Sequence, residues 1–229
     1  MSATFPFAAV IFDMDGVIVD TERYYWDELR ILADSLDIAV TDDELNAQVG
    51  QSTQAFLRML VDWYERAGRG RMTIDDATAL YGTWAQGRTC DYAAIMNPGV
   101  HEAIDGLRAR GVRVALASSS PIKNIRAVLA ACGLADAFEV IVSGVDFTES
   151  KPSPDIYLHT LDKLGLPASA CCCVEDSVPG ITAGRRAGLT VFAKREDRFG
   201  FSQDAADAIL DRVDDILEVA PRLFGSPSS

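Results

Sequence analysis

Residues 8–16 read AAVIFDMDG, and this stretch decides the fold. It begins with an uninterrupted apolar run, a pattern typical of a strand that is buried on both faces of a parallel sheet. The run ends abruptly at Asp13, and Gly16 favours a sharp turn directly after Asp15. We therefore expect both aspartates at the carboxyl end of a buried strand.

Strand-like and helix-like patterns alternate from Pro98 onward. This alternation predicts an α/β fold, a Rossmann-like parallel sheet covered by helices on both faces. Ser120 is expected to cap one of these helices, with Pro121 at the first helical position. The further strands are expected at residues 112–117, 140–142, 171–174 and 190–193.

A different pattern fills the segment between the first strand and this alternating part. Apolar residues recur at helical spacing, for example from Tyr25 to Leu36, and no convincing strand occurs there. We therefore expect residues 19–92 to form a small helical cap domain. It would be inserted into a catalytic core made of residues 1–18 and 93–229.

Charge and hydropathy limit the possible partners. The chain has 229 residues and a formal net charge of -13, which repels nucleic acid and anionic membranes. We therefore expect neither as a partner, and a phosphate site would need its own positive charge from a metal ion, Lys or Arg. No apolar run approaches the roughly 20 residues that span a bilayer, and no signal-peptide pattern is present, so the cytoplasm is the expected compartment.

Three of the five cysteines are consecutive, at positions 171–173, inside one of the predicted strands. Neighbouring side chains of a strand point to opposite faces, so we interpret these cysteines as buried core thiols. The sequence contains no CxxC pair, which argues against metal binding by cysteine.

Polar residues follow four of the predicted strands at the point where each strand ends. In parallel sheets, ligands bind beyond the carboxyl ends of the strands, so these residues are expected at one edge. They are Asp13 and Asp15, the cluster Ser118-Ser119-Ser120, Lys151, and the pair Glu175-Asp176.

This set of side chains suits phosphoryl transfer. Mg²⁺ prefers hard oxygen ligands, which Asp13 and Asp176 can supply. A carboxylate such as that of Asp13 is also a competent nucleophile toward phosphorus. Asp15 can protonate the leaving oxygen and later deprotonate the attacking water. Lys151 and the Ser118 hydroxyl can hold the phosphoryl oxygens and offset their charge.

The order of these groups resembles the four motifs of the haloacid dehalogenase superfamily, over residues 7–191. The helical insert resembles the cap of the subgroup that contains beta-phosphoglucomutase and sugar- and polyol-phosphate phosphatases. Dehalogenating members lack an aspartate at the position of Asp15, so its presence favours phosphate chemistry. The motifs are Asp13-Met14-Asp15-Gly16-Val17, Ser118, Lys151-Pro152 and Glu175-Asp176.

The resemblance implies a role for each motif residue. Asp13 would be the nucleophile and Asp15 the acid and base. Mg²⁺ would be held by Asp13, the backbone carbonyl of Asp15 and Asp176, with Glu175 either a ligand or a residue behind the ligands. The predicted phosphate-binding residues are Gly16, Ser118, Ser119, Lys151 and Arg88.

Two of these assignments have alternatives. Ser119 or Ser120 can share the role of Ser118. Arg88 lies near the end of the helical segment, where members of this subgroup often have a basic residue that faces the substrate. It can equally be a solvated arginine.

The leading hypothesis for function is a Mg²⁺-dependent phosphatase that acts on a small phosphate ester, as a monomer or weak dimer. The second is a phosphomutase. Beta-phosphoglucomutases carry a histidine where this chain has Tyr25, and an arginine after a Gly-x-Ser where Gly50–Ser52 is followed by Thr53. A third is a phospho-acceptor switch that resembles a receiver domain. Receiver domains have no helical insert after the first strand, so this hypothesis ranks last.

Overall fold

The computed structural model describes residues 4–49 and 53–225. The chain divides into two compact units. The first, which we call the core unit, consists of Met1–Asp20 and Asp91–Ser229. The second, the helical unit, is Thr21–Cys90.

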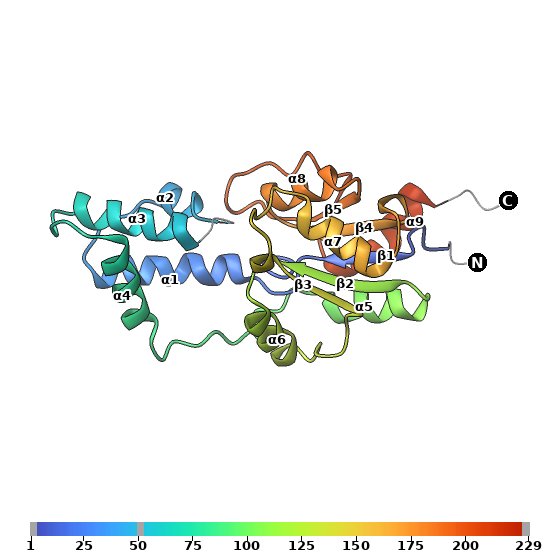
Figure 1. The fold of residues 1–229 in the computed structure, drawn as a ribbon, viewed down its shortest axis with the longest axis horizontal. Helices are drawn as coiled ribbons and strands as arrows, with labels where there is room; N and C mark the ends of the chain where they lie inside the picture. The colour runs from blue at the N-terminus through green and yellow to red at the C-terminus, as the bar shows by residue number, and fades with distance from the viewer. Residues whose placement is uncertain (1–3, 50–52, 226–229) are drawn as a thin grey trace. The chain divides into compact units, whose positions relative to one another are not determined.

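Within the described residues, the core unit contains a six-stranded sheet in the order β3-β2-β1-β4-β5-β6 (Figure 1). Every neighbouring pair of strands is parallel, which confirms the predicted α/β class. Phe12 at the end of β1 pairs with Leu116 on one side and Val174 on the other. The strands are β1 (Ala9–Phe12), β2 (Arg113–Ser118), β3 (Val140–Ser143), β4 (Cys171–Glu175), β5 (Thr190–Lys194) and β6 (Ala208–Leu210).

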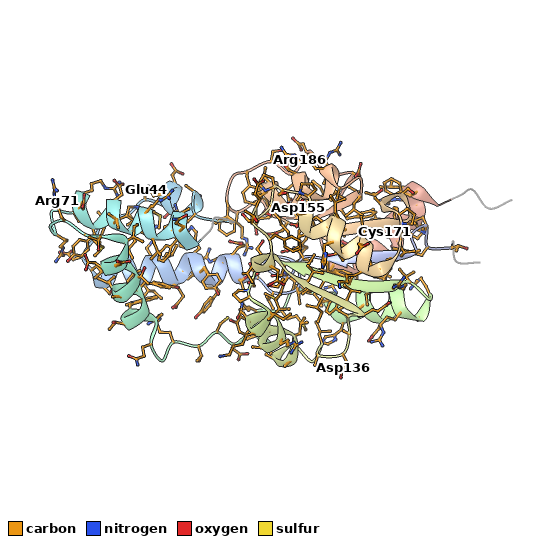
Figure 2. All side chains as sticks on the ribbon, viewed as in Figure 1. Glu44, Arg71, Asp136, Asp155, Cys171 and Arg186 are labelled. Carbon is orange, nitrogen blue, oxygen red and sulfur yellow. The ribbon has the colours of Figure 1, made fainter. Side chains whose placement is uncertain are left out.

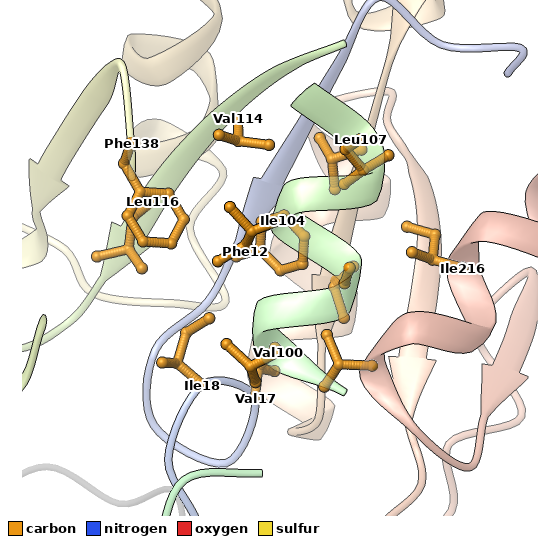
Figure 3. Packing of buried hydrophobic residues seen from close by; sticks show 14 of the residues in the cluster. Phe12, Val17, Ile18, Val100, Ile104, Leu107, Val114, Leu116, Phe138 and Ile216 are labelled. Carbon is orange, nitrogen blue, oxygen red and sulfur yellow. The ribbon is translucent and has the colours of Figure 1, made fainter. Parts of the chain in front are cut away.

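The sheet is covered by helices on both faces. On one face, α5, α6 and α9 pack against Val10 and Phe12, and Figure 3 shows Phe12 facing Ile104 of α5. On the other face, α7 and α8 pack against Ala9 and Ile11. The core-unit helices are α5 (Val100–Ala109), α6 (Ile122–Ala131), α7 (Asp155–Leu164), α8 (Val178–Arg186) and α9 (Ile216–Phe224), with short 3-10 turns at Gly144–Asp146, Ala168–Ala170 and Val213–Asp215.

The three consecutive cysteines of β4 alternate between the two faces. Cys172 belongs to the cluster under α5, whereas Cys171, which Figure 2 labels, and Cys173 belong to the cluster under α7 and α8. All three are fully buried free thiols. The prediction of core thiols is therefore confirmed.

The helical unit is built from α1 (Thr21–Ser35), α2 (Asp42–Asn46), α3 (Thr53–Arg66) and α4 (Ile74–Ala85). Leu32 and Leu60 are among the apolar residues buried between these helices, and Trp63 is buried beside Ala33. The short helix α2 depends on a capping box, in which Thr41 and Glu44 each bond a backbone N–H of the other. No helix in the described ranges is both long and apolar enough to cross a membrane.

The prediction for the start of α6 was wrong. The N-cap is Pro121, which has no side-chain cap hydrogen bond, and Ile122 is the first helical residue. The Ser120 hydroxyl instead donates a hydrogen bond to Asp15, 3.1 Å away. A hydrogen bond to a charged carboxylate is stronger than one between two neutral groups. The Ser120 hydroxyl therefore bonds Asp15 and not a backbone N–H at the start of α6.

Candidate active site

The ends of β1 and β4 place three carboxylates together. The backbone N–H of Asp13 donates to the carbonyl of Val174 over 2.9 Å, which continues the ladder one residue beyond the strand. Glu175 and Asp176 follow directly, so they lie beside Asp13. One carboxylate oxygen from each of Asp13, Glu175 and Asp176 lies within 4.8 Å of the others. All three residues are buried, and their hard oxygen donors are the kind that Mg²⁺ prefers.

Lys151 supplies the positive charge inside this acidic group. Its Nζ lies 2.5 Å from Oδ1 of Asp13 and 2.6 Å from Oε1 of Glu175, and it also donates to the carbonyl of Ala117 over 3.3 Å. Burial acts to lower the pKa of Lys151, but the carboxylates of Asp13 and Glu175 outweigh it and raise that pKa. The lysine is therefore a fixed cation, available to balance phosphoryl oxygens.

The same burial acts on the nucleophile candidate. It raises the pKa of Asp13 well above its ordinary value, and Glu175 and Asp15 add to the rise, while Lys151 opposes it. A divalent cation bound by this carboxylate would act in the direction of Lys151 and favour the charged form. The charged form of the Asp13 carboxylate therefore depends on cations held close to it.

Asp15 is held by two hydroxyls from the end of β2. Its Oδ2 accepts hydrogen bonds from Ser118, over 3.4 Å, and from Ser120, over 3.1 Å. The Ser118 hydroxyl also accepts from the backbone N–H of Ser120, which fixes the turn. Ser119 is exposed. Its Cα lies so close to Gly144 that a Cβ on that glycine would be only 2.9 Å away. The structure therefore joins Ser118 and Ser120 to Asp15.

Gly16 lets the loop after β1 pass close to the acidic group. Its φ of +85° lies in the left-handed region, and a Cβ there would lie 1.9 Å from Oδ2 of Asp176. The side-chain amide of the buried Asn97 donates to the carbonyls of Gly16, over 2.8 Å, and Val17, over 3.0 Å. Any other residue at position 16 would displace the Asp176 carboxylate.

Three residues that support the site were missed by the sequence analysis: Asn97, Tyr157 and Gln203. The Tyr157 hydroxyl donates to Oε1 of Glu175 over 2.5 Å, and the Gln203 amide donates to the carbonyl of Asp176 over 2.6 Å. Only Tyr157 carries a sequence signal, since it puts a hydroxyl on the apolar face of α7. Asn97 and Gln203 lie outside regular elements and resemble ordinary loop residues.

In the helical unit, Arg88 forms a forked ion pair with Glu28, with N–O distances of 2.6 and 2.8 Å. Its guanidinium also lies 4.3 Å from the ring centre of Trp84. A phosphate contact by Arg88 stays a prediction. The Tyr25 ring lies edge-on to Tyr24 on α1. Gly50–Ser52, part of the mutase comparison, lie outside the described residues.

The comparisons with known proteins agree with the motifs. A family model described as haloacid dehalogenase-like hydrolase matches residues 7–188. This chain belongs to that family. The recognition of the family from the motifs is therefore confirmed, and the chain is a hydrolase by family.

Two curated relatives illustrate the similarity. Hexitol phosphatase B of Escherichia coli K12 is 34% identical over an alignment of 196 residues, and the match covers 82% of this chain and 84% of that protein. The phosphorylated carbohydrates phosphatase of Thermotoga maritima is 31% identical over an alignment of 184 residues, and the match covers 79% of this chain and 82% of that protein. Among solved structures, beta-phosphoglucomutase from Clostridium difficile covers 91% of this chain and 92% of its own, with a TM-score of 0.68 and 22% identity, which shows a shared fold.

Proposed function

We propose that this protein is a Mg²⁺-dependent phosphatase that hydrolyses a small phosphate ester, such as a sugar or polyol phosphate, through an aspartyl-phosphate. One observation carries the proposal: a buried carboxylate at the end of β1, Asp13, is in contact with Lys151 and lies within 4.8 Å of two further carboxylates. The phosphatases named among its relatives support the same activity.

In the first step, a carboxylate oxygen of Asp13 attacks phosphorus and the bond to the leaving oxygen breaks. Asp15 gives its proton to that oxygen, so the organic product leaves as an alcohol. In the second step, Asp15 takes a proton from water, and the resulting hydroxide attacks phosphorus. The bond to Asp13 breaks, which releases inorganic phosphate and restores the carboxylate. The hydroxyls of Ser118 and Ser120 hold Asp15 in place.

The charge of the phosphoryl group requires nearby cations. Lys151 is placed to bind a phosphoryl oxygen beside Asp13, since its Nζ already lies 2.5 Å from Oδ1 of that residue. The carboxylates of Asp13 and Asp176, with the Asp15 carbonyl, would hold Mg²⁺, and Glu175 lies beside them. When bound, the metal would offset the negative charge of the phosphoryl oxygens.

The experiment that tests the proposal is a phosphate-release assay. The purified protein is incubated with Mg²⁺ and a panel of sugar, polyol and glycolytic phosphates, and with para-nitrophenyl phosphate as a general substrate. Multiple turnovers are expected with at least one phosphate ester. A single phosphorylation without turnover would instead support a phospho-acceptor switch.

A phosphomutase is the second candidate. The fold of this chain is shared with a beta-phosphoglucomutase, and a mutase would use the same Asp13-Asp15 pair. Tyr25 argues against a mutase, because beta-phosphoglucomutases carry a histidine at this position. An unperturbed phenol has a pKa of about 10, so tyrosine is a poor proton relay near neutral pH. The protein is incubated with beta-glucose 1-phosphate and a trace of glucose 1,6-bisphosphate. We expect free phosphate; accumulation of glucose 6-phosphate with little free phosphate would favour the mutase.

A further inference from the structure

Tyr157 is fully buried and lies in the first turn of α7. It comes four residues after Ser153, which directly follows the Lys151-Pro152 motif. Its hydroxyl donates to Oε1 of Glu175 over 2.5 Å. The same oxygen accepts from Nζ of Lys151 over 2.6 Å. Phenol and ammonium therefore share one acceptor atom, although they come from different parts of the chain.

The ring of Tyr157 also touches the lysine. Its centre lies 5.2 Å from Nζ of Lys151, within the range of a cation–π contact. Tyr157 thus acts on Lys151 in two ways, directly through the ring and indirectly through the carboxylate of Glu175. Substitution by Phe removes the hydroxyl alone, whereas substitution by Leu removes the hydroxyl and the ring together.

Glu175 has no room to move away from these donors. Its side chain is fully buried, and a Cβ on Gly180 would lie 1.9 Å from its Oε2. Oε2 also accepts from the backbone N–H of Asp176 over 3.3 Å and lies 3.5 Å from the Ser177 hydroxyl. The carboxylate is therefore held between the start of α8 on one side and Tyr157 and Lys151 on the other.

We propose that Tyr157 is a positioning residue, which acts through Glu175 to keep the ammonium of Lys151 shared with Asp13. The phenol donates one of the hydrogen bonds that the buried carboxylate of Glu175 accepts. Without it, Glu175 would bind the ammonium more closely and draw it away from Asp13 and from the phosphoryl oxygens. The inference rests on the proposed function, because it assigns Lys151 to the phosphoryl group.

The main test compares Tyr157→Phe, which keeps the ring, with the wild-type protein in Mg²⁺ and a turned-over phosphate ester. A charge-assisted hydrogen bond is lost, so we expect kcat to fall about 10-fold or more. KM should change less than about 3-fold, because Tyr157 is fully buried and its hydroxyl is bonded to Glu175. Tyr157→Leu should lose more, since it also removes the ring. Tyr64→Phe, in the helical unit, is the matched control and should keep the wild-type kcat.

A double-mutant cycle tests the route through Glu175. If the Tyr157 hydroxyl acts only through that carboxylate, Tyr157→Phe added to Glu175→Gln should cost no further activity. Additive losses would overturn the proposed route. An unchanged kcat in Tyr157→Phe, or a loss that only follows the folded fraction measured by circular dichroism, would overturn the positioning role.

A readout without turnover separates this inference from the proposed function. Beryllium fluoride with Mg²⁺ imitates a phosphoryl group on Asp13, and its binding is measured as a rise in Tm. We expect a smaller rise in Tyr157→Phe than in the wild-type protein or Tyr64→Phe. If no phosphate ester is hydrolysed but this difference is found, the proposed function fails and the role of Tyr157 stands. Equal rises would overturn the role of Tyr157 whatever the activity.

Discussion

The Nζ of Lys151 lies 2.5 Å from Oδ1 of Asp13, although 138 positions separate the two residues in the sequence. The lysine belongs to the loop after β3, and the aspartate directly follows β1. Because β2 lies between these strands, the lysine reaches across the end of β2, where it donates to the carbonyl of Ala117. The candidate nucleophile is therefore paired with its cation before any substrate arrives.

The first prediction concerns the nucleophile. Asp13→Asn should abolish turnover in the phosphate-release assay, because an amide does not attack phosphorus and does not offset the charge of a metal ion. The fold should be kept, which circular dichroism checks. Asp136→Asn, at an exposed position of the core unit, is the matched control and should keep the wild-type rate. Wild-type turnover in freshly purified Asp13→Asn protein would refute the assignment.

The second prediction concerns Asp15. Asp15→Asn should lower kcat by about 100- to 10,000-fold, since it removes the proton donor and acceptor. Ser120→Ala should cost less, because it removes one of the two hydroxyls that hold Asp15, over 3.1 Å. The measurement is kcat with substrates of different leaving groups. The loss in Asp15→Asn should shrink for para-nitrophenyl phosphate, whose leaving group needs little protonation, and an equal loss for all substrates would contradict the role.

The third prediction concerns Lys151. Lys151→Met leaves the buried carboxylates of Asp13 and Glu175 together without their shared cation. Breaking a buried ion pair in this way typically costs about 3–5 kcal/mol, so the free energy of unfolding in urea should fall by that order, and turnover should be lost. Lys123→Met removes an exposed lysine of α6 and should change neither quantity appreciably. Equal urea midpoints for the two variants would show that the pairing is not structural.

The fourth prediction concerns the metal. EDTA should stop turnover and Mg²⁺ should restore it, whereas Ca²⁺ should bind but support little turnover because its larger, looser shell misplaces the nucleophile. Mg²⁺ should also raise Tm, and Asp176→Asn should lose this rise because it removes a carboxylate of the buried acidic group. Asp162→Asn, an exposed position on α7, should keep the rise. Full activity in EDTA would exclude the metal assignment.

The fifth prediction concerns the stability of the helical unit at low pH. The Arg66 guanidinium and the backbone N–H of Thr41 lower the pKa of Glu44 from its ordinary value of 4.5 to about 2. Because the folded pKa is depressed, this contribution to stability is present above about pH 4.5 and is lost as the pH falls toward 2. Glu44→Gln should remove that part of the pH dependence.

The measurement for Glu44 uses tryptophan fluorescence, since all three tryptophans lie in the helical unit. Thr41→Ala, which removes the other half of the capping box, should cost about 1 kcal/mol at neutral pH. Glu218→Gln changes an exposed glutamate of α9 in the core unit and serves as the control. Identical acid profiles for Glu44→Gln and the wild-type protein would contradict the role of the capping box.

Local patterns predicted most of the sheet. Five strands were located because each is a short, continuous apolar run between turn signals, as expected for strands buried on both faces. The sixth, β6, was missed because it contains three residues and carries no periodic signal. Its pairing with β5 depends on the sheet edge that β5 already offers.

The sequence by itself determined the chemistry of the strand ends, since Asp13, Asp15, Lys151, Glu175 and Asp176 could be assigned to one edge of a parallel sheet from the order of strands and motifs. Only the tertiary structure decided which groups hold them. The Ser120 hydroxyl bonds Asp15 rather than a helix end, Tyr157 shares Glu175 with Lys151, and Asn97 bonds the carbonyl of Gly16. Such contacts depend on the side-chain positions of elements far apart in sequence, and local periodicity contains no information about those positions.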